Sequence, residues 1–126
     1  MKTINVETRN LNSNAIDWAI ATIKGFPIKY DPMGFKTGTQ AGFWIWDEAI
    51  NGKMLLIGEN YSPSTSWTDG GVIIENEGIS LIKFDGWIAK TVDGIEAVGE
   101  TPLVAAMRAY IVTNLGESTE VPEYLL

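Results

Sequence analysis

Apolar residues at helical spacing predict a first helix near the start of the chain. Asn12 or Ser13 can cap it, and the pattern runs to Lys24. Gly25 stands where a left-handed residue ends a helix, and Pro27 follows it. The apolar positions that set this spacing are Ile16, Ala19, Ile20 and Ile23.

Two further helices are predicted in the second half, the first over residues 67–76. The last helix opens at Thr101-Pro102, because a hydroxyl residue caps a helix well and proline suits its first position. Gly116 closes it. Its apolar stripe consists of Leu103, Ala106, Met107 and Tyr110.

Short strands are predicted between the helices, because these segments alternate or contain many β-prone residues. They span residues 2–7, 26–30, 43–46, 54–58, 79–84 and 87–89. Asn51-Gly52 and Asp85-Gly86 are tight-turn signals, the first inside a long hairpin between 43–46 and 54–58. Residues 31–42 fit a loop, residues 92–99 a loop or weak strand, and residues 117–126 an acidic tail.

These elements predict a single α+β domain over residues 1–126. The expected architecture is a small α-β-α sandwich, a mostly antiparallel sheet with about three helices. The pattern leaves open whether the helices cover one face of the sheet or both. A chain of 126 residues can bury a core without disulfides.

The residue inventory argues against catalysis. The chain has no cysteine and no histidine, so it lacks thiolates, the commonest general base and the commonest metal ligand. The acids that remain as candidates show no recognisable catalytic spacing. They are Asp17, Asp47, Glu48, Asp69 and Glu75. We therefore expect a protein that is not an enzyme and holds no cofactor or metal.

The net charge of −7 is spread along the chain. A protein that binds a nucleic acid polymer normally carries a basic stripe, and none is visible. Anionic membranes are disfavoured for the same reason, and no apolar stretch approaches the ~20 residues that span a bilayer. The start of the chain does not resemble a signal peptide. The expected location is cytoplasmic.

Residues 60–71 contain the candidate binding site. Tyr61 and Trp67 offer aromatic faces for stacking, while small hydroxyl residues and glycines can leave backbone N–H groups free for a ligand. The small residues of this set are Ser62, Ser64, Thr65, Gly70 and Gly71. The two adjacent glycines cost about 2 kcal/mol in a helix, which indicates close packing or exposed amides at the helix start.

The same stretch also fits an ordinary strand-to-helix turn, with Ser64 or Thr65 as N-cap and Trp67 in the core. A second aromatic segment covers residues 43–46. Trp44 and Trp46 share one face of this strand, which is either core or a contact surface for a ligand or partner.

Arg108 and Arg9 are the cations expected near a bound ligand. Arg108 lies at the edge of the apolar stripe of the last helix. It also fits a solvated or salt-bridged surface residue.

Four groups of residues follow one another in a fixed order that resembles a known family. They are Leu11…Ala15-Ile16-Asp17-Trp18-Ala19, Tyr61-Ser62-Pro63-Ser64-Thr65-Ser66-Trp67…Gly70-Gly71…Ile74-Glu75, Thr101-Pro102-Leu103-Val104-Ala105-Ala106-Met107-Arg108 and Glu120-Val121-Pro122-Glu123. This order closely resembles the NinX-like proteins of tailed phages. It is also similar to phage ABA-sandwich domains, which share a Tyr-Ser-Thr turn into a helix. The resemblance implies an α-β-α sandwich and a phage accessory role in the host cytoplasm, and it leaves out residues 31–53.

Two functions fit these observations. The first is a non-catalytic binder, a sponge that sequesters a nucleotide-derived immune signal such as a cyclic oligonucleotide or an ADP-ribose derivative. A base would stack on Tyr61 or Trp67, and helix-start amides would hold a phosphate. The alternative is an acidic inhibitor or adaptor that docks on a host protein through residues 43–46. A homo-oligomer is expected, because a pocket shared between protomers would suit a bulky nucleotide.

Overall fold

The computed structural model describes residues 2–34, 41–46 and 54–126, which form three α-helices and eight strands. The helices are α1 (Ser13–Ile23), α2 (Trp67–Glu77) and α3 (Pro102–Leu115). The strands are β1 (Thr3–Glu7), β2 (Ile28–Asp31), β3 (Gly42–Trp46), β4 (Met54–Leu56), β5 (Ser80–Phe84), β6 (Gly86–Lys90), β7 (Glu96–Gly99) and β8 (Ser118–Pro122). Short 3₁₀ turns occupy Thr8–Asn10 and Glu123–Leu125.

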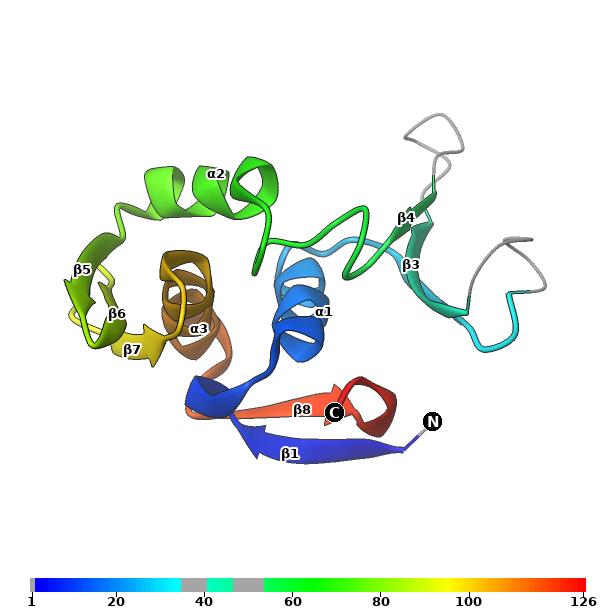
Figure 1. Ribbon diagram of the computed structural model, residues 1–126. Helices are drawn as coiled ribbons and strands as arrows, with labels where there is room; N and C mark the ends of the chain where they lie inside the picture. The colour runs from blue at the N-terminus through cyan, green and yellow to red at the C-terminus, as the bar shows by residue number, and fades with distance from the viewer. Residues whose placement is uncertain (1, 35–40, 47–53) are drawn as a thin grey trace.

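The predicted α+β class, the three helices and the antiparallel strand pairing are confirmed. The strands are divided among three small sheets, β1-β8, β2-β3-β4 and β5-β6-β7, instead of joining in one (Figure 1). The prediction of an acidic tail is wrong for residues 118–122, which form β8 and pair with β1. The predicted turn at Asn51-Gly52 lies outside the described residues.

α3 is the central element of the fold. It packs on α1, on α2, on β8 and on the inner face of the β5-β6-β7 sheet (Figure 1). It is apolar on most of its surface, which is typical of a helix enclosed on several sides. The side chains at the centre of the core come from α1, α3 and β8, and include Ile16, Ile20, Met107, Ile111 and Val121.

Small residues let the β5-β6-β7 sheet approach α3 closely. Ala89 and Ala97 are buried on its inner face. A Cβ atom at Gly99 would lie 2.5 Å from the backbone nitrogen of Ala105, so only glycine fits there. This packing fixes the start of α3 beside the end of β7.

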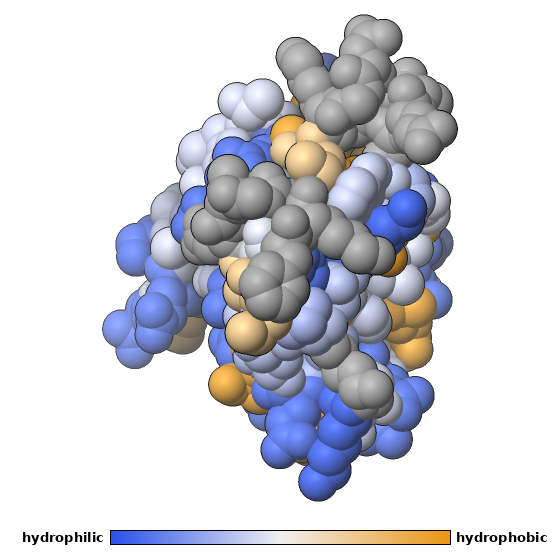
Figure 2. Space-filling model, turned by 90° about the vertical axis from the view of Figure 1, so that its right-hand side faces the viewer, coloured by the Kyte–Doolittle hydropathy of each residue, from blue (hydrophilic) through white to orange (hydrophobic). Residues whose placement is uncertain are grey.

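The β2-β3-β4 sheet stands to one side of this core (Figure 1). β3 and β4 pair antiparallel, with Trp44 opposite Leu56, which confirms the predicted pairing of these segments. Tyr124 meets Tyr30 and Phe43 edge to face, at centroid distances of 5.4 and 6.0 Å, and ties this sheet to the last turn of the chain. On this side of the molecule apolar residues form separate small patches among hydrophilic ones (Figure 2).

Within the described ranges, every helix is too short or too polar to cross a lipid bilayer.

Candidate functional site

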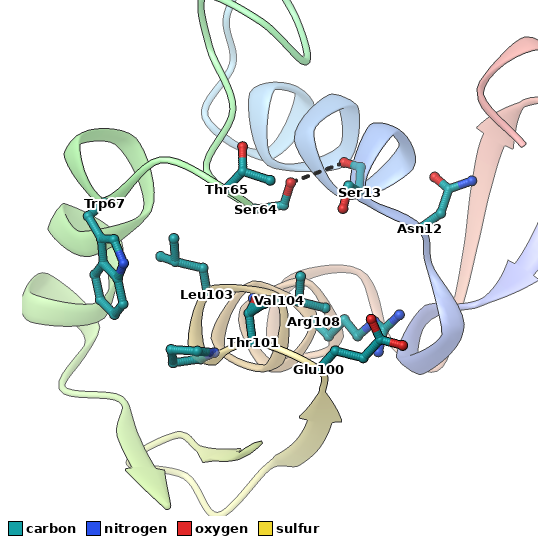
Figure 3. A pocket seen from close by; sticks show the side chains of 11 residues that line it. Asn12, Ser13, Ser64, Thr65, Trp67, Glu100, Thr101, Leu103, Val104 and Arg108 are labelled. Carbon is teal, nitrogen blue, oxygen red and sulfur yellow. Dashed lines mark hydrogen bonds between the residues drawn. The ribbon is translucent and has the colours of Figure 1, made fainter. Parts of the chain in front are cut away.

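A groove of about 660 Å³ opens between the start of α3, the start of α1 and the turn that leads into α2. Trp67 stands at one end, and Arg108 and Glu100 lie at the other (Figure 3). Its lining consists of Asn12, Ser13, Ser64, Thr65, Trp67, Glu100, Thr101, Pro102, Leu103, Val104 and Arg108.

Two carboxylates hold the turn that forms one wall. Asp17 Oδ1 on α1 accepts a hydrogen bond from the Ser64 backbone N–H at 2.8 Å. Asp69 Oδ2, in the first turn of α2, accepts from the Ser62 N–H at 2.9 Å. The Thr65 N–H donates to the Ser62 carbonyl at 3.0 Å. Because separate elements supply these bonds, the turn has a defined position relative to α1 and α2.

Gly70 allows α2 to pack directly on this turn. A Cβ atom there would lie 2.3 Å from the Pro63 carbonyl oxygen and 2.7 Å from Leu103 Cδ2. At Gly71 the nearest atom would be Trp67 Cε3 at 3.5 Å, an ordinary contact. Of the two purposes expected for these glycines, Gly70 therefore serves close packing.

Trp67 is the first residue of α2, and 56 % of its surface is exposed. This exposure contradicts the interpretation of Trp67 as a core residue. Ser66 is the N-cap, in place of the expected Ser64 or Thr65, and its side chain makes no capping hydrogen bond. The indole ring is thus available at the edge of the groove (Figure 3).

The start of α3 forms the opposite wall. Thr101 is the N-cap as predicted, and its Oγ1 accepts a hydrogen bond from the Val104 N–H at 3.1 Å. Pro102 occupies the first helical position. Two helix N-termini, those of α2 and α3, therefore border one groove, and each carries a partial positive charge.

Arg108 binds backbone carbonyl groups. Its Nε and Nη2 donate to the Leu11 carbonyl at 3.1 and 2.8 Å, and its Nη1 donates to the Val98 carbonyl at 2.9 Å. Burial lowers the pKa of Arg108, and the negative charge of Glu100 opposes this shift. These bonds use three of the five guanidinium donors and keep the cation at the end of the groove.

Burial also changes the pKa of two groups behind the turn. It raises the pKa of Asp17 from 3.8 to about 7, against the lowering effect of its hydrogen bonds with Ser64, and Asp69 adds to the rise. Burial raises the pKa of Tyr61 to about 12, and the negative charges of Asp69 and Asp17 contribute. Burial therefore favours the protonated form of Asp17 and moves its titration toward neutral pH.

The structure brings four of the predicted site residues together in the groove: Ser64, Thr65, Trp67 and Arg108. Tyr61 is not in the lining. Its ring meets Phe26 edge to face at 5.4 Å and packs against the core.

The other predicted residues also lie elsewhere. Ser62 is buried in the turn, and Gly70 and Gly71 lie inside α2. Trp44, 7 % exposed, and Trp46 belong to β3, outside the groove, and the Lys29 ammonium lies 4.9 Å from the Trp46 ring centroid. Arg9, the second expected cation, pairs with Glu117.

The expected set of free amides is only partly present. The N–H groups of Ser64, Thr65 and Gly70 are bound to Asp17, Ser62 and Ser66, which contradicts their expected role as phosphate donors. The first three residues of α2, 67–69, keep N–H groups that have no partner inside the helix, as at any helix start.

The parts of the lining that come from the start of α1 and from the end of β7 were not predicted from the sequence. Asn12 and Glu100 are examples. The Thr101-Pro102 helix start was a usable signal for this wall, but local patterns do not reveal which helix starts meet in space. Among the described residues, no group of three or more Asp, Glu, His or Cys side chains could hold a metal ion.

Comparison with protein families gives a match over most of the chain. The family described as "Bacteriophage P22, NinX" matches residues 7–114. This range includes the whole lining of the groove. No curated protein matches the chain.

Proposed function

We propose that this chain, which belongs to the bacteriophage P22 NinX family and is a phage accessory protein, binds a small nucleotide-like molecule without transforming it. The ligand class is a nucleotide-derived immune signal, such as a cyclic oligonucleotide or an ADP-ribose derivative. Binding would withdraw that signal from its receptor in the host cytoplasm.

The exposed indole of Trp67 at the mouth of the groove is the observation that carries this proposal. A large aromatic residue that is 56 % exposed offers a flat face on which a base can stack. The groove, at about 660 Å³, falls within the usual size range of small-molecule sites. Arg108 and two helix N-termini supply positive potential for a phosphate, which the negative charge of Glu100 at the Arg108 end opposes.

The composition of the lining supports binding without chemistry. Its hydroxyl groups come from Ser13, Ser64, Thr65 and Thr101. Ser64 Oγ faces the Ser13 carbonyl at 3.5 Å, and Thr101 Oγ1 caps α3. Nucleophilic catalysis needs a general base beside the hydroxyl group. The lining holds no histidine, and its carboxylate, Glu100, lies at the Arg108 end of the groove (Figure 3).

The alternative, an inhibitor anchored by Trp44 and Trp46, has less support. It requires an exposed aromatic face on β3, and Trp44 is only 7 % exposed. We therefore place the binding site at Trp67. The expected homo-oligomer remains a prediction, which sedimentation equilibrium tests.

Thermal shift measurements against cyclic dinucleotides, cyclic oligonucleotides and ADP-ribose derivatives test the proposal. Ligand at ~100 times its dissociation constant adds about 2.7 kcal/mol and raises the melting temperature by several degrees. Trp67→Ala should abolish the shift, and Trp46→Ala, outside the groove, should preserve it. The compound should be recovered intact after heating.

Two results would overturn the proposal. Conversion of the compound would make the protein an enzyme. The absence of a shift with every compound would favour a host protein partner, to be sought by affinity capture from infected cells.

A further inference from the structure

A single residue separates a buried carboxyl group from the groove. Asp17 is 2 % exposed and lies behind Ser64, whose backbone N–H donates to Asp17 Oδ1 at 2.8 Å. Ser64 is itself part of the groove lining. A charge on Asp17 therefore acts on whatever occupies the groove at close range.

The groups around Asp17 do not neutralise this charge. Asp69 of α2 is a second carboxylate, and it accepts a hydrogen bond from the Ser62 N–H of the same turn. Tyr61 lies at the start of the turn, and Tyr110 of α3 contributes to the raised pKa of Tyr61. In the described part of the chain the ion pairs are Lys2 with Glu123 and Arg9 with Glu117, and neither includes Asp17.

Protonation removes the charge without removing the hydrogen bond. A neutral carboxyl group still has an oxygen that accepts from the Ser64 N–H. The wall of the groove can thus keep its shape in both states of Asp17. Because burial raises the pKa of Asp17 to about 7, both states are populated near neutral pH.

We infer that Asp17 makes the groove a proton-linked anion site, in which an anionic ligand binds preferentially to the form with a neutral Asp17 and takes up a proton on binding. This inference rests on the proposed function, since it assumes an anion in the groove. An anion next to Ser64 repels an ionised Asp17, so the bound state favours protonation. At an effective dielectric constant of about 20, a unit charge about 12 Å from a bound anion changes its affinity roughly tenfold.

Calorimetric titration tests the linkage with three probes: cyclic di-AMP, ADP-ribose and inorganic sulfate. Each keeps a constant charge between pH 6 and pH 8.5, so a pH effect belongs to the protein. The wild-type chain should bind roughly tenfold more tightly at pH 6 than at pH 8.5. Titrations at pH 7 in two buffers of different ionisation enthalpy should show net proton uptake.

Variants assign the effect to one carboxyl group. Asp17→Asn should bind at pH 8.5 as tightly as the wild type does at pH 6, with no proton uptake. Asp69→Asn is the matched control, because it removes the other carboxylate on this turn and leaves Asp17 in place. It should retain the pH dependence. The amide signal of Ser64 in NMR spectra of the free protein should titrate near neutral pH, except in Asp17→Asn.

The outcomes separate this inference from the proposed function. Binding with equal affinity at both pH values, or pH dependence that persists in Asp17→Asn, would overturn the inference and leave the ligand site standing. A failure of all probes to bind at either pH, in the wild type and in Asp17→Asn, would overturn both. Two wild-type measurements keep the inference testable even if Asp17→Asn does not fold. Zero proton uptake in the two-buffer titration would overturn it, and so would a Ser64 amide signal that does not titrate near neutral pH.

Discussion

Two aromatic segments of similar composition differ in how far their tryptophan rings are buried. β3 carries Trp44, whose ring is buried at 7 % exposure, while α2 begins with Trp67 at 56 %. Trp44 lies inside a strand with a neighbour on either side, and Trp67 lies at a helix end that faces a groove. Burial of an aromatic residue here depends on its place in the fold, and residue type alone does not reveal it.

Truncating each tryptophan is the sharpest test of this difference. Trp44→Ala should lower the free energy of unfolding by about 4 kcal/mol, because it removes a buried aromatic side chain and leaves a cavity. Trp67→Ala should change it by less than about 0.5 kcal/mol, because the ring is mostly in water. Urea unfolding of both variants measures these values. Equal losses would show that Trp67 belongs to the core.

The second test concerns the turn that presents Trp67. Gly70→Ala should destabilise the protein by about 3 kcal/mol, because the new methyl group collides with the Pro63 carbonyl and Leu103. Gly71→Ala is the matched control and should stabilise α2 by up to about 1 kcal/mol, since alanine favours helix and has room there. Thermal unfolding distinguishes the two. A stable Gly70→Ala variant would mean that α2 can move away from the turn.

The two regions also differ in how much of their structure could be predicted from the sequence. The helix bounds followed from spacing, caps and glycines, and Gly25 indeed has a positive φ of 76°. The strand at residues 43–46 was predicted, but both of its faces are apolar, so alternation did not decide between core and contact surface. β8 was missed because its partner is β1, more than a hundred residues away.

The candidate site was predicted only in part, because local patterns do not show which distant residues meet. Ser64, Thr65 and Trp67 are neighbours in the chain, and Arg108 joins them through tertiary packing. The N–H group of Ser64 was expected to be free, since nothing local indicates that Asp17 on α1 accepts from it. Local chemistry identified the turn, and long-range pairing decided which groups stay available.

A third test examines how the buried carboxyl group of Asp17 changes the free energy of unfolding with pH. The native state raises the Asp17 pKa from 3.8 to about 7, so it favours the protonated form. The stability that the folded state gains from a protonated Asp17 is fully present below pH 3.8. It declines as the pH rises to about 7 and is lost above that pH. Asp17→Asn should be more stable than the wild type by up to about 4 kcal/mol at pH 8, because a pKa raised by about three units corresponds to that free energy, and the difference should vanish near pH 4.

Urea unfolding at several pH values measures this difference. Trp44→Ala is the control, because it removes no ionisable group, and its loss should not change with pH. A constant difference for Asp17→Asn across the range would contradict the raised pKa.

The smallest expected effect lies on the other wall of the groove. Thr101→Ala removes the side chain that caps α3 through the Val104 N–H, and should cost about 1 kcal/mol. Thr101→Ser keeps the hydroxyl group and should recover most of the loss. Thermal unfolding measures both. A serine variant as weak as the alanine variant would show that the methyl group, and not the cap, matters.

The pairing of β1 with β8 has a consequence for the order of folding during synthesis. Thr3 lies opposite Pro122, so the first strand has no partner until the ribosome has released residues 118–122. α1, α2 and the β5-β6-β7 sheet consist of nearby residues and can form earlier, whereas closing so long a loop is slow. The nascent chain therefore exposes Ile4 and Val6 to chaperones until residues 118–122 emerge and β8 can pair with β1.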